Sequence, residues 1–216
     1  MKKITGQLYF LKGILFFCLF VLTAGILVAC GASSATENTL SFRSDGTITA
    51  DFFADFPKER YNLTLFEEEA KASVKAYNET AGSRRIRLVS VSGNEEKAHI
   101  TMRYRSFEDY QAFNRQNVYY GTVQDGLSSL SLEGSVKLRS SDGKETVTIR
   151  ELGKAEQNGE ARWRIIAVAD TVLIRHKGTP SYLSSNAVIR EDGLIAVNED
   201  LPAGDLPETA YVVYKK

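Results

Sequence analysis

The sequence predicts an α+β fold, in which an antiparallel sheet built from hairpins carries two helices in the N-terminal half of the mature chain. Two observations lead to this prediction. Four Asx-Gly dipeptides separate β-rich runs, and two segments have apolar residues at helical spacing. The dipeptides are Asp45-Gly46, Asp142-Gly143, Asn158-Gly159 and Asp192-Gly193. Such pairs suit type I′ turns, because both central residues of the turn need positive φ.

The expected strands lie on either side of these turns. They are Leu40–Arg43, Thr47–Phe53, Val136–Leu138, Thr146–Ile149, Arg162–Val168, Ala187–Arg190, Leu194–Val197 and a closing strand, Thr209–Tyr214. Two more strands, within 85–88 and 98–105, alternate apolar with polar or charged residues and are joined by a turn at 92–94. Residues 40–114 therefore follow the order β-β-α-β-β-α, and residues 117–216 are mostly β.

The first predicted helix covers about Leu65 to Glu79. Thr64 and Glu67 match a capping box, and Gly82 suits the position just after the helix. Its apolar face is expected to pack on the sheet: Phe66, Ala70, Val74 and Tyr77 against Ile86, Leu88, Ile100 and Met102. The second predicted helix covers about Phe107 to Asn114, after the cap-like pair Ser106 and Asp109.

The N-terminal segment is typical of a bacterial lipoprotein precursor. Three lysines precede the uncharged run Gly13–Ala29, and Leu27-Val28-Ala29-Cys30 looks like a lipobox. A cysteine at this place is typically thioether-linked to a diacylglyceryl group, and the peptide before it, residues 1–29, is removed. Two alternatives stay open. The run approaches the ~20 residues of a membrane-spanning helix, and a plain signal peptide would leave Cys30 as a free thiol.

The segment organisation follows from this leader. Residues 30–39 are small and polar and are expected to be a flexible tether, and 40–216 form the globular domain, with a subdivision near 121–134 as an open alternative. The leader holds three lysines and no acidic residue. The mature chain therefore has 24 of the 27 basic residues and all 27 acidic residues. This balance gives no basic field for nucleic acid. Cys18 lies in the leader, so the mature body has no disulfide.

Several short blocks of the mature chain carry a resemblance. They are Glu37-Asn38-Thr39-Leu40 with Ser44-Asp45-Gly46, Ala76-Tyr77-Asn78, Ala98-His99-Ile100-Thr101-Met102-Arg103-Tyr104 with Tyr110-Gln111-Ala112-Phe113-Asn114, and Tyr120-Gly121-Thr122-Val123. With the lipobox, they resemble a group of small lipoproteins of clostridial-type Gram-positive bacteria. The resemblance implies an envelope location and a shared fold, and it implies no catalytic residues.

Candidate catalytic and metal-binding patterns are weak. The two histidines, His99 and His176, are expected at the surface and have no metal-ligand spacing. A Ser135–Lys137 pair stays open as a nucleophile with its base. The cluster Glu67-Glu68-Glu69 is expected to complement the dipole of the first helical turn. Hence no catalytic residue, metal or cofactor is predicted.

Two neighbouring aromatic residues, Tyr119 and Tyr120, are the remaining candidates for a binding site. Tyr119 and Tyr120 would point to opposite sides of an extended segment, so at least one is expected to be exposed and to form a binding surface. The prediction is therefore a lipoprotein on the extracytoplasmic face of the cell membrane, held through acylated Cys30. Its folded part would bind an envelope protein or glycan without catalysis. The alternative is a small enzyme, or enzyme accessory subunit, acting on cell wall or glycan.

Overall fold

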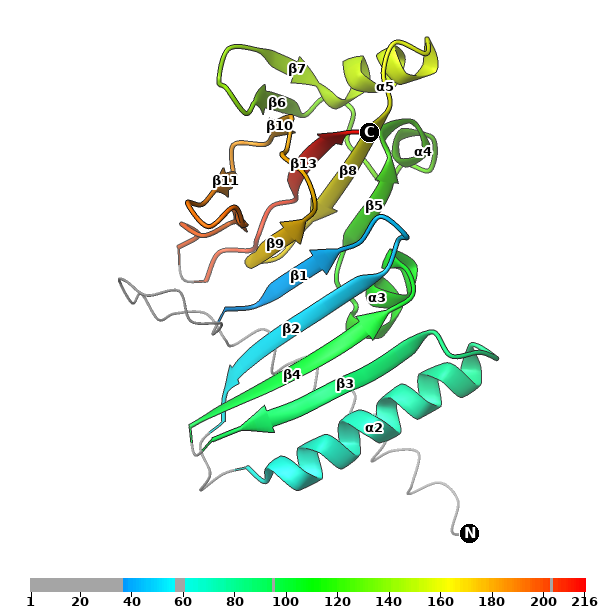
Figure 1. Ribbon diagram of the computed structural model, residues 1–216, viewed down its shortest axis with the longest axis vertical. Helices are drawn as coiled ribbons and strands as arrows, with labels where there is room; N and C mark the ends of the chain where they lie inside the picture. Colours follow the sequence, from blue (N-terminus) through cyan, green and yellow to red (C-terminus); the bar gives the residue numbers. More distant parts are fainter. Residues whose placement is uncertain (1–36, 57–60, 95, 203) are drawn as a thin grey trace. The chain divides into compact units, whose positions relative to one another are not determined.

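The computed structural model describes residues 37–56, 61–94, 96–202 and 204–216 (Figure 1). The predicted leader and Cys30 lie outside the described residues. The described chain is a mixed α/β fold with four helices and two mostly antiparallel sheets. It divides into two compact units. The described residues of the smaller unit fall within Asp51–Met102, and those of the larger unit fall within Glu37–Ala50 and Arg103–Lys216.

The smaller unit contains one helix and three strands. They are α2 (Leu63–Thr80), the later residues of β2 (Ile48–Asp55), β3 (Ile86–Gly93) and most of β4 (Lys97–Tyr104), with the strands in the order β2, β4, β3. The helix packs on β3 through its buried Ala70 and Val74, while Phe66 and Tyr77 are half-buried. Three of the expected sheet partners, Ile86, Ile100 and Met102, are buried and Leu88 is half-buried. The predicted helix is therefore confirmed.

The start of α2 differs from the prediction. Its N-cap is Asn62, whose side-chain Oδ1 accepts hydrogen bonds from the N–H groups of Thr64 and Leu65. Thr64 thus lies inside the helix, and the predicted capping box is wrong, because asparagine two residues earlier satisfies the same free N–H groups. The glutamates from Glu67 onward consequently lie beyond the first turn. Glu67 pairs instead with Lys71, at 2.6 Å.

Asn78 fixes the connection from α2 to β3. Its Oδ1 accepts hydrogen bonds from the N–H groups of Arg85, at 2.7 Å, and of Ile86, at 2.9 Å. Its Nδ2 donates to the carbonyl oxygen of Ile86 at 2.9 Å. One amide side chain therefore satisfies three backbone groups at the start of β3.

The larger unit contains four strands of one sheet, in the order β11, β12, β9, β1. Their bounds are β1 Thr39–Phe42, β9 Val172–His176, β11 Ala187–Ile189 and β12 Ile195–Val197. β1 and β9 pair in parallel, unlike the antiparallel arrangement predicted, and the other two pairs are antiparallel. Thr39 is buried and begins β1. The predicted tether is thus too long, since its residues 37–39 already belong to the described fold.

The second sheet lies wholly in the larger unit and has six strands, in the order β5, β8, β13, β10, β6, β7. Their bounds are β5 Val118–Thr122, β6 Lys137–Ser140, β7 Thr146–Thr148, β8 Trp163–Val168, β10 Tyr182–Leu183 and β13 Ala210–Lys215. The helices α4 (Val123–Ser128) and α5 (Ile149–Gln157) pack on each other. A hydrophobic cluster joins them to one face of this sheet: Tyr119, Val123, Leu132, Leu138, Ile149, Leu152, Trp163, Ile165, Ala167, Tyr211 and Val213.

The helix α3 (Phe107–Asn114) has the predicted bounds, and Ser106 caps it by accepting from the N–H of Asp109. The prediction that helices are confined to the N-terminal half is wrong, because α4 and α5 follow residue 121. α5 begins with a capping box, Thr148 with Glu151, where a strand was expected to continue. Residues 121–134 lie inside the larger unit.

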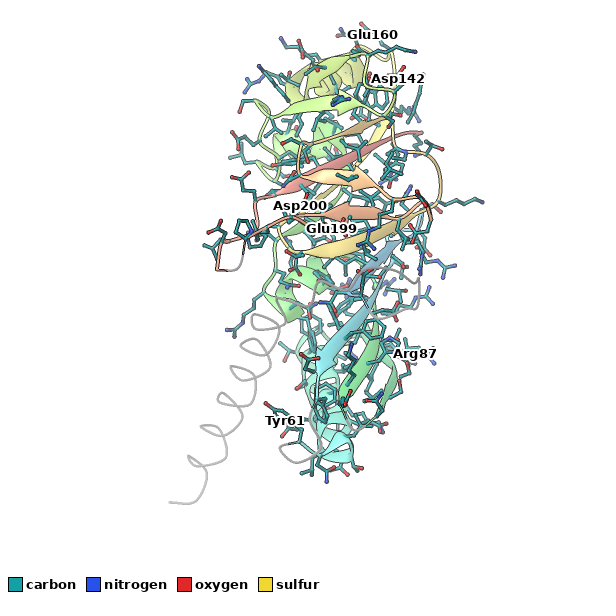
Figure 2. The ribbon with its side chains drawn as sticks, turned by 90° about the vertical axis from the view of Figure 1, so that its left-hand side faces the viewer. Tyr61, Arg87, Asp142, Glu160, Glu199 and Asp200 are labelled. Carbon is teal, nitrogen blue, oxygen red and sulfur yellow. The ribbon has the colours of Figure 1, made fainter. Side chains whose placement is uncertain are left out.

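All four predicted Asx-Gly glycines have positive φ. The strands on either side of Gly143 and of Gly193 pair antiparallel. Gly159 instead follows α5 and ends a helix. Figure 2 shows Asp142 and Glu160, which adjoin two of these glycines, among the exposed side chains of the larger unit. Among the described residues, no helix combines the length and apolar character needed to cross a membrane.

Candidate functional site

A cluster of polar aromatic residues occupies the face of the six-stranded sheet opposite α4 and α5. Arg164 of β8 lies directly across from Thr122 of β5 and Tyr214 of β13. Tyr120 lies two residues before Thr122 and so points to the same face. The hydrophobic cluster uses the alternate residues, including Tyr119, Ile165 and Val213.

His176 joins these side chains from the other sheet of the larger unit. It is the last residue of β9, and its register partner on the parallel strand β1 is Phe42. We call Tyr120, Arg164, His176 and Tyr214 the His176 cluster. The rings of His176 and Tyr214 have centroids 4.0 Å apart, and those of His176 and Tyr120 are 5.9 Å apart. The aromatic contacts extend to Phe42, 5.4 Å from Tyr120.

Polar contacts within the cluster are few. Tyr120 Oη lies 3.2 Å from His176 Nε2, a hydrogen bond whose direction depends on the tautomer of the ring. The Cζ atom of Arg164 lies 5.7 Å from the centroid of the Tyr120 ring, within the range of a cation–π interaction. Within the part of the chain that the structure describes, the guanidinium of Arg164 makes no ion pair with a carboxylate.

Two buried polar atoms of the cluster lack a hydrogen-bond partner. They are His176 Nδ1 and Tyr214 Oη, and Trp163 Nε1 is the third such atom among the described residues. Buried polar groups in folded proteins are nearly always hydrogen-bonded, so each such group needs a reason. Two of them occur here on rings in direct contact.

Burial keeps the cluster's rings neutral. Desolvation lowers the pKa of His176 below its ordinary value, and the positive charge of Arg164 lowers it further. Burial raises the pKa of Tyr214, and it also raises that of Tyr120 against the opposing effect of Arg164. The cluster therefore presents one fixed positive charge beside three neutral rings at neutral pH.

The cluster lies where several strands of the larger unit end. Phe42 is the last residue of β1, and His176 is the last residue of β9. Tyr214 is the last residue but one of β13. His176 and Arg164 are half-buried, and the residues after His176, Lys177 and Gly178, are exposed. The cluster thus lies at the strand ends of the larger unit.

Two other polar groupings are present. In the larger unit, Gln116 connects Tyr110 to Asp170 by accepting from Tyr110 Oη at 2.6 Å and donating to Asp170 Oδ2 at 2.8 Å. In the smaller unit, Asp51 Oδ1 lies 3.0 Å from His99 Nε2 and accepts from Thr101 Oγ1 at 2.7 Å. Because Asp51 and Thr101 both contact the same nitrogen of His99, the ring cannot relay a proton between them.

Most of the predicted site residues have surroundings that differ from those expected. Tyr119 and Tyr120 are 6% and 5% exposed, so the expected exposed aromatic surface is wrong. They do point to opposite faces, but helices cover one face and the His176 cluster occupies the other. His176 is likewise not the surface histidine expected. Ser135 donates to Glu133 Oε1 at 2.8 Å.

The remaining predictions concern metals and the anchor. Among the described residues, no group of three or more His, Cys, Asp or Glu side chains could hold a metal ion. Cys30 lies outside those residues. Sequence reasoning missed the contact of His176 with this sheet. Strand alternation could have placed Tyr120, Arg164 and Tyr214 on the face opposite the hydrophobic cluster.

Comparison with known proteins adds no identity: no protein family, curated protein or solved structure matches this chain.

Proposed function

We propose that this protein is an extracytoplasmic lipoprotein, held to the cell membrane through acylated Cys30, whose folded part binds another component of the cell envelope without catalysis. The lipobox Leu27–Cys30 supports the anchor. The described fold begins at Glu37, seven residues after Cys30. Seven residues span at most about 25 Å, so the folded part would work close to the membrane.

The unpartnered polar atoms of the His176 cluster carry the binding part of this proposal. Within the described part of the chain, Tyr214 Oη and His176 Nδ1 are buried without a hydrogen-bond partner, beside Arg164, which makes no ion pair there. An incoming ligand that satisfies them recovers the free energy lost by leaving them unpaired, about 1–3 kcal/mol per group. The cluster itself contains no carboxylate, serine or cysteine. Its chemistry suits recognition.

One observation favours the second candidate, a small enzyme or accessory subunit acting on cell wall or glycan. His176 Nε2 contacts Tyr120 Oη at 3.2 Å, and a neutral histidine beside a hydroxyl is a common acid–base arrangement. However, burial raises the pKa of Tyr120, which works against its ionisation as a nucleophile. Binding is therefore the first proposal.

The anchor is tested by metabolic labelling with a fatty acid. The wild-type chain and the Cys18→Ser variant should incorporate the label and partition with membranes. Cys30→Ser should take up no label and accumulate as an unprocessed precursor. Membrane partition of a mature chain with unmodified Cys30 would contradict the proposal.

The choice between binding and catalysis is tested with purified cell-wall sacculi. The detergent-solubilised full chain should sediment with the sacculi and release no soluble fragments. The Arg164→Gln variant should sediment less, while the exposed Arg175→Gln variant should behave as wild type. Reproducible release of fragments that is abolished by His176→Gln would instead establish the enzyme alternative.

A further inference from the structure

The hydrogen bond between Tyr120 and His176 determines which ring nitrogen of His176 carries the proton. Tyr120 Oη has one contact among the described residues, His176 Nε2. If the ring donated, Tyr120 would hold a proton without an acceptor, and Nδ1 would be a buried acceptor without a donor. If Tyr120 donates to Nε2, only one of these groups is left unsatisfied. The second arrangement is favoured, and it puts the ring proton on Nδ1.

This tautomer makes the cluster rich in donors. His176 Nδ1–H, the Tyr214 hydroxyl and the Arg164 guanidinium can all donate, and no acceptor in the described chain is bonded to any of them. Asp45, whose charge acts on Tyr120, is engaged elsewhere, because it accepts from the N–H of Thr47 at 3.0 Å. A partly buried guanidinium without a counter-charge is unfavourable. An acceptor with negative charge would pair with all three groups.

We propose that the His176 cluster binds an oxyanion, a carboxylate or phosphate group of the ligand. Arg164 supplies the positive charge and a planar set of donors that matches both groups. Tyr214 on the neighbouring strand β13 and His176 on β9 of the other sheet each supply one neutral donor. The inference rests on the proposed function, because it names the chemistry recognised by the same binding site.

The ligand approaches from the strand ends. His176 closes β9, and Lys177 and Gly178 follow it at the surface. Gly178 has a φ of +113°, and a Cβ at this position would meet no atom within 4 Å. The segment that follows His176 is thus open to solvent.

The test uses the full-length acylated protein in nonionic detergent micelles, with sodium phosphate or sodium acetate titrated against chloride at constant ionic strength. The ring nitrogens of histidine are followed by ¹⁵N NMR. The chain has two histidines, so a His99→Gln variant assigns the His176 signals. We expect the Nδ1–H tautomer of His176 and a saturable shift with one of the two anions. Preference for phosphate identifies a phosphate-bearing ligand, and preference for acetate identifies a carboxylate.

Matched variants make the test specific. Arg164→Gln and Tyr214→Phe should each weaken binding about 10-fold or more, the loss expected for one hydrogen bond to a charged group. Arg175→Gln is the control, because Arg175 precedes His176 on β9, is exposed and points to the opposite face. It removes the same charge and should change affinity less than about 2-fold. Trp163 fluorescence verifies that each variant is folded, and Tyr214→Phe keeps the packing if Arg164→Gln does not fold.

The inference is overturned if neither anion saturates, if Arg175→Gln weakens binding as much as Arg164→Gln, or if His176 carries its proton on Nε2. These outcomes are separable from failure of the anchor. Oxyanion binding by a chain without fatty acid at Cys30 would contradict the proposed location and leave this site standing. A labelled chain without oxyanion binding would do the reverse.

Discussion

Asp170 should destabilise the larger unit at neutral pH, and Asp170→Asn should relieve this. The carboxyl group lies between β8 and β9 and is largely buried. It accepts two hydrogen bonds, from the N–H of Thr171 and from Gln116 Nε2, each at 2.8 Å. These bonds favour the charged form but do not offset the desolvation, so the pKa of Asp170 rises to about 6.

The pKa difference sets the size and sign of the effect. An unfolded aspartate has a pKa of ~3.9, and each unit of difference corresponds to ~1.4 kcal/mol, so the full effect is about 3 kcal/mol. Because the folded state holds the proton more tightly, the stabilising contribution is complete below pH ~4 and is lost as the pH rises through ~6. Asp170→Asn carries no charge, and its amide oxygen can still accept from Gln116 Nε2, so that Gln116 Oε1 continues to accept from Tyr110 Oη.

Urea unfolding followed by Trp163 fluorescence measures this effect. Trp163 is the single tryptophan of the chain and lies in β8, in the same unit as Asp170. At pH 7.5, Asp170→Asn should be about 1–3 kcal/mol more stable than wild type, and the difference should vanish near pH 4.

Asp45→Asn is the control of opposite sign. The N–H of Thr47 lowers the pKa of Asp45, so this variant should be less stable than wild type at pH 7.5, with the difference shrinking as the pH falls. If Asp170→Asn proves less stable than wild type at pH 7.5 and equal to it at pH 4, the carboxylate is stabilising and the reasoning fails.

Three further substitutions test the packing. Asn78→Ala leaves the backbone groups of Ile86 without their partner and should cost about 2–4 kcal/mol, seen as faster hydrogen exchange of α2 and β3 amides; unchanged protection would contradict it. Gly126→Ala would place a Cβ 2.5 Å from Leu132 Cδ1, so thermal unfolding should show a loss of about 1–3 kcal/mol. Phe66→Ala should cost less than the ~3–5 kcal/mol of a fully buried ring, because Phe66 is half-buried, and circular dichroism at increasing urea measures the loss.

The elements found from sequence are those whose signals are local. α3 has the predicted bounds because a serine cap and an aromatic stripe both lie within ten residues. The start of α2 was misplaced because Asn62 and Thr64 are both good caps, and only the backbone geometry distinguishes them. Cap chemistry thus predicts that a helix begins, and leaves its first residue uncertain by two.

The missed helix α5 has a different cause. Asn158-Gly159 suits both a hairpin turn and a helix end, because both need a residue with positive φ. The capping box Thr148–Glu151 was the local signal that could have decided between them. A second consequence is long-range: Glu156 of α5 accepts hydrogen bonds from the N–H groups of Gln124, at 2.8 Å, and Trp163, at 3.2 Å. Such a tie between distant segments has no local signature.

The His176 cluster could be predicted only in part from the sequence. Alternation along β5, β8 and β13 predicts that Tyr120, Arg164 and Tyr214 share the face opposite the hydrophobic cluster, but it also assigns an arginine-bearing face to solvent. That assignment fails because β9 brings His176 against this face, through pairing with β1 more than 130 residues earlier in the chain. A charged residue on such a half-buried face is costly to folding unless something compensates it. Since the described chain supplies no carboxylate to Arg164, its charge is compensated by solvent or by a ligand, and the oxyanion proposed for this site would also pair the donors of His176 and Tyr214.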